Sequence, residues 1–212
     1  YISGEKIATS KGLAVRRGWL LFCLVITLGV LAAFKYYDFF VQNLELLAGG
    51  LGFRVDGFVA HILVPVGLSF YTFQALTYPL DIYRGHLQPR KNFLDVAFFV
   101  SFFPQLAAGP IERAKNIFPQ LDARRVFNRS EFEKGCWLIF WGLFKKVFVA
   151  DNLAVLVNAR FDNSATITAP VLYLSLIAYA FQIYCDFSSY TDMARGSAKL
   201  FGINLIENFN FP

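Results

Sequence analysis

The chain has 212 residues, of which 56% are hydrophobic, 18% aromatic and only 17% charged. An average soluble domain carries about 25% charged residues, so a single soluble domain explains this composition poorly. The net charge of +5 comes from basic residues gathered in short loops between apolar segments, which is typical of membrane topology and not of nucleic-acid binding. We therefore predict that the lipid bilayer surrounds the chain and that nucleic acid is not a partner.

Apolar stretches that could be membrane segments follow one another along the chain. In order they are residues 18–34, 58–80, 96–111, 135–157 and 169–187. Stretches of this length suit membrane helices, which satisfy their own backbone hydrogen bonds in lipid. The predicted fold is an all-α, polytopic transmembrane helical protein, with residues 1–212 forming part of one membrane domain. Because the chain starts at Tyr1 and its only methionine is Met193, we expect it to be an internal piece of a longer protein.

The stretch 96–111 differs from the other stretches in its flanks and in its breaks. Basic loops, which contain Arg90 and Arg113, lie on both sides of it, so a simple crossing would break the positive-inside rule. Pro104 and the pair Gly109-Pro110 interrupt its helical pattern. We predict a re-entrant segment here and four crossings elsewhere. The alternative is a kinked span that ignores the charge rule.

Lys145 and Lys146 interrupt the aromatic stretch 135–157. A lysine near the bilayer centre costs roughly 2.5–3.5 kcal/mol, so two adjacent lysines need an explanation. In one interpretation the helix starts late or tilts, and both ammonium groups reach the lipid head groups. In the other, both lysines face a cavity that receives a phosphate-bearing donor.

Polar side chains gather at the end of the stretch 169–187. Gln182 and Asp186 are four residues apart, so a helix places them on one face, which Tyr190 continues. Such groups are costly in a span unless they face protein or water. They could bind a polar acceptor or position a base. Equally, they could form a polar clamp between helices, with a helix cap at Ser188 or Ser189.

The histidines and cysteines give no catalytic or metal-binding pattern. His61 lies in an apolar stretch and is expected to be structural, and His86 lies in a basic loop and is expected to be solvated. Cys23, Cys136 and Cys185 show no paired spacing, which indicates reduced thiols. We therefore predict no catalytic residue, no metal site and no bound cofactor within the chain. Beyond these groups, residues 193–201 are predicted to form a separate short helix.

Short sequence blocks carry a resemblance to a known family. They are PVGLSFYTFQ at 65–74, FFPQLAAGPI at 102–111, GLFKKV at 142–147, ADNL at 150–153, YCDFS at 184–188 and ENFNFP at 207–212. In this order the blocks resemble the membrane-bound O-acyltransferase family. The most similar branch is the bacterial alginate O-acetyltransferases, which are related to the D-alanyl transfer protein of teichoic acid synthesis. The resemblance covers the chain from about Ile62 onward.

The resemblance implies a function and a place for it. It implies transfer of acetyl groups from a cytoplasmic donor, acetyl-coenzyme A or an acyl carrier protein, to hydroxyls of an extracytoplasmic polysaccharide such as alginate. The protein would be a multi-pass protein of the bacterial inner membrane, with tilted helices around a tunnel and polysaccharide-acetylation partner proteins on the periplasmic side. Residues expected to line the tunnel or support its lining are Gln182, Tyr184, Asp186, Tyr190, Asp192, Asn208 and Asn210. Lys145 and Lys146 would be donor-side contacts.

The resemblance also implies that the catalytic base lies elsewhere. The family's histidine is expected beyond Pro212, so the chain alone is expected to be inactive. Ser189 and Arg195 stand where the family pattern has glycine and an apolar residue, and Arg195 could alter the cytoplasmic mouth of the tunnel.

Two other classes of protein fit the same residues. A proton- or ion-coupled transporter would place Asp186, Lys145 and Lys146 on an ion path. A non-catalytic membrane scaffold of a polysaccharide export complex would use the helices for assembly alone.

Overall fold

The computed structural model describes residues 1–50, 52, 65, 67–106, 109–162 and 168–209. Within these ranges every regular element is helical, which confirms the all-α prediction. The helices pack into two compact units, Tyr1–Ser101 with Arg113–Lys115, and Phe102–Glu112 with Asn116–Pro212. Each unit is described by itself, and the prediction of one membrane domain over residues 1–212 stays a prediction.

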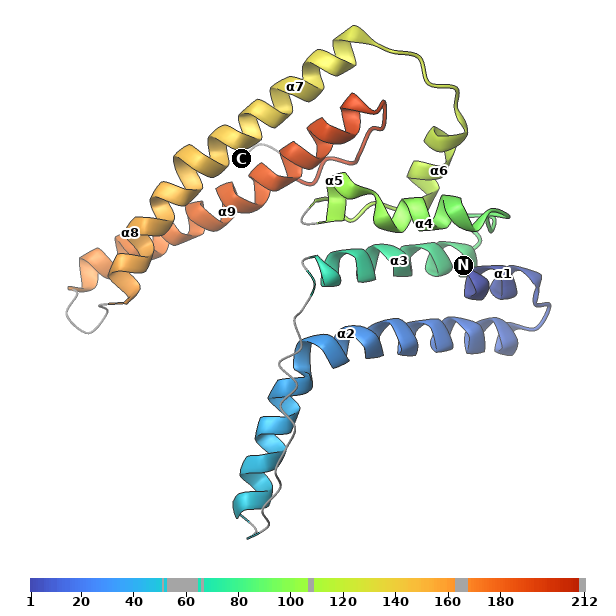
Figure 1. Cartoon of the computed structure of the whole chain (residues 1–212), viewed down its shortest axis with the longest axis horizontal. Helices are drawn as coiled ribbons and strands as arrows, with labels where there is room; N and C mark the ends of the chain where they lie inside the picture. The colour runs from blue at the N-terminus through green and yellow to red at the C-terminus, as the bar shows by residue number, and fades with distance from the viewer. Residues whose placement is uncertain (51, 53–64, 66, 107–108, 163–167, 210–212) are drawn as a thin grey trace. The chain divides into compact units, whose positions relative to one another are not determined.

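The first unit is built on a long helix. It contains α1 (Ile2–Thr9), α2 (Leu13–Gly50), α3 (Leu68–Tyr83) and α4 (Phe93–Ser101), and α3 packs against each of the other three helices (Figure 1). Near the start of α2, Arg16 donates from Nη2 to the carbonyl oxygen of Tyr83, at 2.9 Å. The buried Gln74 joins α3 to α4, because its Nε2 donates to the carbonyl oxygen of Phe99, at 2.6 Å. Both of these side chains therefore bond to backbone carbonyl oxygens, which satisfies polar groups away from solvent.

α2 presents apolar side chains to its surroundings along its whole length. None of its residues is buried, and Val25 and Leu46 are 69% and 75% exposed. An exposed apolar surface of this extent is unfavourable in water and favourable in hydrocarbon. The predicted segment 18–34 therefore lies in a helix whose surface suits lipid.

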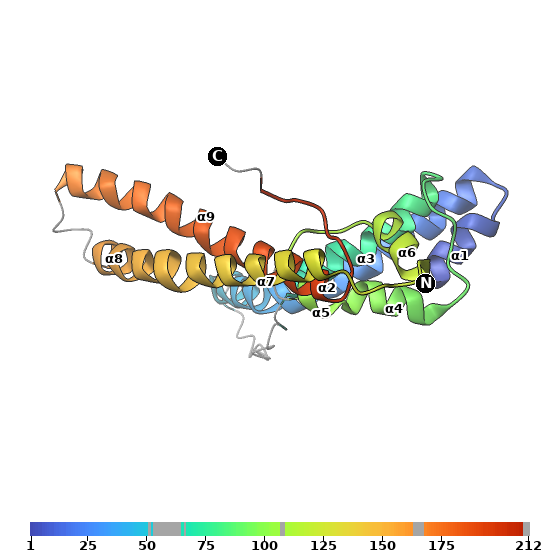
Figure 2. The same ribbon diagram turned by 90° about the horizontal axis from the view of Figure 1, so that it is seen from above.

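The second unit is dominated by two long helical stretches that lie side by side (Figures 1 and 2). Its helices are α5 (Phe103–Leu106), most of α6 (Ala114–Asp122), α7 (Arg129–Phe144), the π-helical turn η1 (Lys145–Ala150), α8 (Asp151–Phe161) and α9 (Ala169–Leu200). α7, η1 and α8 follow one another without a break, so the predicted segment 135–157 is helical throughout. It begins six residues earlier than predicted, at Arg129, because Asn128 caps it by accepting hydrogen bonds from the backbone of Ser130 and Glu131.

α9 corrects two predictions. The helix runs as one element from Ala169 to Leu200, so residues 193–201 do not form a separate helix. Ser188 and Ser189 do not cap a helix end, because both lie inside α9 and their hydroxyls donate to carbonyl oxygens three residues earlier. Such hydroxyl bonds satisfy a serine within a helix without ending it.

The remaining predicted segments are described in part. Two of the described helices, α2 and α9, are long and apolar enough to cross a membrane. Residues 58–64 and 66 of the stretch 58–80 lie outside the described residues, and from Leu68 the stretch is α3. The stretch 96–111 is broken at Phe102, between α4 and α5, and its last residues, 109–111, are not helical. The predicted break is confirmed, whereas re-entrance and the number of crossings stay predictions.

Candidate functional site

The helices α7 and α9 approach closely because glycines face each other. A Cβ atom added to Gly196 would lie 2.6 Å from the carbonyl oxygen of Gly135, and one added to Gly142 would lie 2.7 Å from that of Ser189. Any larger side chain would push the helices apart. Small residues at such a contact are a common way to pack membrane helices. The close contact brings the charged residues that follow Gly142 up to α9.

Lys145 reaches a carboxylate and a hydroxyl of α9. Its Nζ lies 2.6 Å from Oδ2 of Asp192 and donates to Oγ of Ser188, at 2.9 Å. The side chains of Lys145 and Asp192 are 14% and 15% exposed. Two charges this far from solvent stabilise a structure only when they are paired and hydrogen-bonded, and here both conditions hold.

Lys146 takes the next carboxylate along α9. Its Nζ lies 2.6 Å from Oδ1 of Asp186 and 2.8 Å from Oδ1 of Asp151, and it stands 5.6 Å from the ring centre of Tyr190. The Asp186 side chain is 44% exposed. The result is a half-exposed carboxylate held in place by an ammonium group.

The structure therefore brings part of the predicted site together. On α9, Asp192 is paired with Lys145 and Asp186 is paired with Lys146, which also stands over the ring of Tyr190. The interpretation in which the helix starts late is wrong, because α7 begins at Arg129. The interpretation in which a tilted helix brings the lysines to the head groups stays a prediction. Whether the lysines contact a donor stays a prediction.

Other predicted residues lie apart from these ion pairs. The Oε1 of Gln182 is buried and has no hydrogen-bond partner among the described residues. Tyr184 packs edge-on against Phe209, with the ring centres 5.5 Å apart. Asn208 is exposed, and Asn210 lies outside the described residues.

Sequence reasoning missed how the lysines are neutralised. The sequence interpretations place each lysine against lipid or a ligand, although Asp186 lies in the next apolar stretch and Asp192 follows shortly after it. Because a charge in a span is stable only with a partner, two lysines in one stretch and aspartates in and just after the next indicate ion pairs between the helices.

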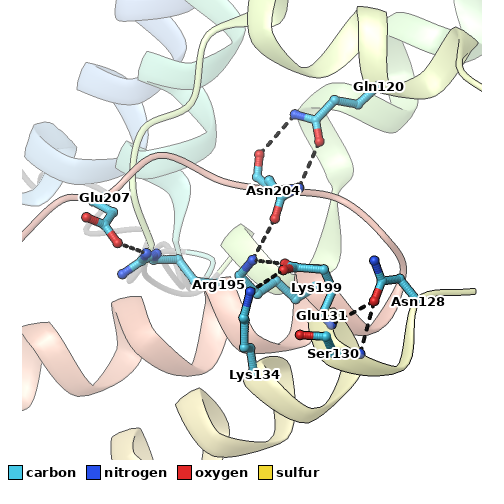
Figure 3. A network of polar contacts seen from close by, with 9 residues as sticks. All are labelled: Gln120, Asn128, Ser130, Glu131, Lys134, Arg195, Lys199, Asn204 and Glu207. Atoms are coloured by element: carbon cyan, nitrogen blue, oxygen red, sulfur yellow. Dashed lines mark hydrogen bonds and ion pairs between the residues drawn. The ribbon is translucent and has the colours of Figure 1, made fainter.

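A second polar network lies at the other end of the α7–α9 pair (Figure 3). Lys199 of α9 and Lys134 of α7 both donate to Glu131, Lys134 at 2.7 Å to Oε1. These two hydrogen bonds, that of Lys134 first, lower the pKa of Glu131 to about 2. Arg195 pairs with Glu207, and Asn204 accepts from Lys199 at 2.7 Å. This network ties the chain beyond α9 back to the helices.

The histidines and the acidic residues offer no further chemistry in the described part of the chain. His86 is exposed and its Nδ1 stands 3.9 Å from Oδ1 of Asp81, while His61 lies outside the described residues. No three histidine, cysteine, aspartate or glutamate residues of the described ranges gather as metal ligands would. That the protein binds no metal stays a prediction. The Asp186 carboxylate is 44% exposed beside its pair with Lys146 and can accept a hydrogen bond from a hydroxyl. That it contacts a substrate stays a prediction.

Comparison with known proteins identifies relatives for almost the whole chain. No family model matches the sequence. The chain is 40% identical over 195 residues to a probable alginate O-acetylase, AlgI, from Azotobacter vinelandii, which covers 92% of this chain and 38% of that protein. It is 33% identical over 238 residues to a peptidoglycan O-acetyltransferase from Helicobacter pylori, which covers 100% of this chain and 44% of that protein.

The chain belongs to the membrane-bound O-acyltransferase family. A more distant relative, a teichoic acid D-alanyltransferase from Bacillus subtilis, is 27% identical over 153 residues, or 69% of this chain and 38% of that protein. The resemblance noted in the sequence blocks is thereby confirmed. Membership also agrees with the lipid-compatible surface of α2, and the protein is a membrane protein.

The chain spans about two fifths of the length of the curated relatives that it matches. The activity, substrates and partners of the whole protein are therefore proposals.

Proposed function

We propose that the complete protein containing this chain is a multi-pass O-acetyltransferase of the bacterial inner membrane. It moves acetyl groups from a cytoplasmic donor to hydroxyls of an extracytoplasmic polysaccharide, with alginate as the acceptor. The observation that carries this proposal is the 40% identity over 92% of the chain to proteins described as alginate O-acetylases. The peptidoglycan O-acetyltransferase relative is less similar, at 33%, which favours alginate over peptidoglycan.

The ion pairs between η1 and α9 give the chain a defined part in this reaction. In acetyl transfer, the acceptor hydroxyl oxygen attacks the carbonyl carbon of a thioester, loses its proton to a base, and releases the donor thiol. The Asp186 carboxylate, held by Lys146 at 2.6 Å and 44% exposed, would accept a hydrogen bond from a substrate hydroxyl and orient it. The base itself would be the family's histidine, which is implied beyond this chain.

The proposals for the acyl donor and for the partner proteins rest on the family resemblance and not on a cavity in the structure. We propose acetyl-coenzyme A or an acyl carrier protein as donor, no bound cofactor, and acetylation partner proteins on the periplasmic side. Lys145 and Lys146 are already paired with carboxylates, so a phosphate-bearing donor would have to compete with Asp186 or Asp192 for them.

The test is complementation in an alginate-producing bacterium that lacks its own O-acetyltransferase. The complete protein is expected to restore acetyl esters on the secreted alginate, measured per uronate residue, without changing the mass of alginate secreted. An empty vector is the control. Secreted alginate without ester would contradict acetyl transfer, and a rise in the mass secreted without ester would favour the scaffold or the transporter.

A further inference from the structure

The segment after α9, residues 203–209, is held by side chains as a strand would be held by another strand. We call this segment the strap. Gln120 uses both ends of its amide on one strap residue: Nε2 donates to the carbonyl oxygen of Asn204 at 2.9 Å, and Oε1 accepts from its backbone N–H at 2.8 Å. This is the pair of bonds that a neighbouring strand would supply. The strap backbone is thus satisfied without a second strand.

Glu112 holds the strap two residues further on. Its side chain is fully buried, Oε2 accepts from the backbone N–H of Ile206 at 2.8 Å, and Oε1 accepts from Nδ2 of Asn116 at 2.7 Å. Between these contacts the strap alternates: Ile203 and Leu205 are 0% and 8% exposed, whereas Asn204 and Ile206 are exposed. An extended chain with one buried face has a fixed register.

Two charged side chains of α9 also bind the strap. Lys199 donates to Oδ1 of Asn204, at 2.7 Å, and Arg195 pairs with Glu207, as Figure 3 shows. Arg195 is the residue that departs from the family pattern, and its guanidinium also stands 3.8 Å from Asp192. The strap is therefore held from the Glu112–Gln120 side and from the α9 side.

The end of the strap places an aromatic ring, that of Phe209, against the part of α9 that carries Asp186. Phe209 packs edge-on against Tyr184 and Phe187, with ring centres 5.5 and 5.3 Å apart. These two residues flank Asp186 in sequence on α9. Since an extended chain advances about 3.3 Å per residue, fixing Ile206 confines Phe209 to within roughly 10 Å. The hydrogen bonds that Glu112 and Gln120 make with the strap therefore determine where Phe209 contacts α9.

We propose that Gln120 and Glu112 are positioning residues, which hold the strap so that Phe209 braces the part of α9 that carries Asp186. This inference rests on the proposed O-acetyl transfer, because it assigns the two residues a role in that reaction. The two residues act on Asp186 through the backbone of the strap and the ring of Phe209.

The first experiment measures how often the strap lifts from its buried position. Leu205→Cys is introduced into the complete protein after Cys23, Cys136, Cys185 and every cysteine outside this chain are changed to serine. The rate of maleimide labelling in detergent is then measured. Because Leu205 is buried, labelling requires the strap to lift. Adding Gln120→Ala is expected to raise the rate about tenfold, because the two hydrogen bonds that Gln120 makes with the backbone of Asn204 no longer hold the strap. The matched control is Gln88→Ala, an exposed glutamine, which is expected to leave the rate unchanged.

The second experiment reads function by the ester content of secreted alginate, normalised to the amount of protein in the membrane. Gln120→Ala and Glu112→Leu are expected to lower ester content at least fivefold, while Glu112→Gln, which keeps an acceptor for Ile206, retains most of it. An unchanged labelling rate in Gln120→Ala would overturn the claim that Gln120 holds the strap in place. Faster labelling with normal ester content would overturn the positioning role. If the unmutated protein forms no ester, the proposed function fails and the labelling rates alone decide whether Gln120 holds the strap in place.

Discussion

Lys145 of η1 and Asp192 of α9 form an ion pair with Nζ and Oδ2 2.6 Å apart, and both side chains are about 85% buried. An isolated charge at such a position would be strongly unfavourable, so each residue requires the other. The pair sets the register of the two helices beside the glycine contacts. It also explains how an apolar helical stretch carries a lysine without a ligand to neutralise it.

We expect a double-mutant cycle on this pair to show strong coupling. Lys145→Met and Asp192→Asn, each alone, should lower the free energy of unfolding by about 3 kcal/mol, because each removes the nearest opposite charge from a largely buried group. After Lys145→Met, Asp192 keeps, among the described residues, only the longer contact with Arg195, at 3.8 Å. The double variant should cost less than the sum by about 1–3 kcal/mol. Unfolding titrations with SDS in mixed micelles measure these values.

The surface pair Arg129–Glu133 is the matched control for this cycle. Its N–O distance is 2.8 Å, but its side chains are 85% and 62% exposed. A helical pair in solvent should show coupling of about 0.3–0.5 kcal/mol. Equal coupling in the two cycles would contradict the importance of burial at Lys145.

Replacing Gly196 by alanine should separate α7 from α9. The new Cβ atom would lie 2.6 Å from the carbonyl oxygen of Gly135 and 2.8 Å from Cγ1 of Ile139. Because backbone cannot yield locally, we expect a loss of about 1–3 kcal/mol. The control is Gly29→Ala in α2, where no atom lies within 4 Å of the added carbon. That change should be neutral or stabilise by about 0.5–1 kcal/mol. A loss of stability at Gly29 as large as that at Gly196 would contradict the packing explanation.

The pH dependence of stability should reveal Glu131, which lies outside the predicted span 135–157. Its folded pKa is about 2, lowered from 4.5 chiefly by the hydrogen bond from Lys134 and then by that from Lys199. A lowered pKa contributes stability that is complete above the unfolded value of 4.5 and is lost as the pH falls towards 2. The difference in stability between the wild type and Glu131→Gln should therefore be constant from pH 8 to about 5 and shrink below it. Melting temperatures in detergent across this range measure the difference, and a difference that grows on acidification would contradict the assignment.

The sequence predicted the helical class and the membrane surroundings because both depend on composition and on stretch length. It failed at the interior of α9, where polar residues suggested a helix end near Ser188. No proline or glycine stands between Gln182 and Arg195, so the backbone had no reason to stop. The serine hydroxyls bond within the helix instead. Polar composition alone is thus weaker evidence for a helix end than a residue that cannot continue the helix.

The candidate site was predictable in its residues and less so in its contacts. The spacing of Gln182 and Asp186 correctly predicted helical neighbours, but their bonding differs: Asp186 meets Lys146, and the Oε1 of Gln182 has no partner among the described residues. Pairs such as Gln120 with Asn204 join residues 84 positions apart. The periodicity of the sequence carries no information about residues so far apart. Their contact depends on how the segment after α9 folds back.

Asp186 and Asp192 should respond differently to the same substitution. Lys146 retains Asp151 at 2.8 Å when Asp186 is lost, and Asp186 is 44% exposed. We therefore expect Asp186→Asn to cost only about 0–1 kcal/mol of stability, against about 3 kcal/mol for Asp192→Asn.

The functional effects of the two substitutions should run in the opposite order once protein amounts are equalised. If Asp186 orients the acceptor hydroxyl, Asp186→Asn should reduce the acetyl content of secreted alginate about 10- to 100-fold, because a misplaced substrate loses the advantage of orientation. Asp192→Asn should reduce it mainly through the amount of folded protein in the membrane. Normal acetylation by Asp186→Asn would remove Asp186 from the site and leave its pair with Lys146 as a contact that serves only the packing of the helices.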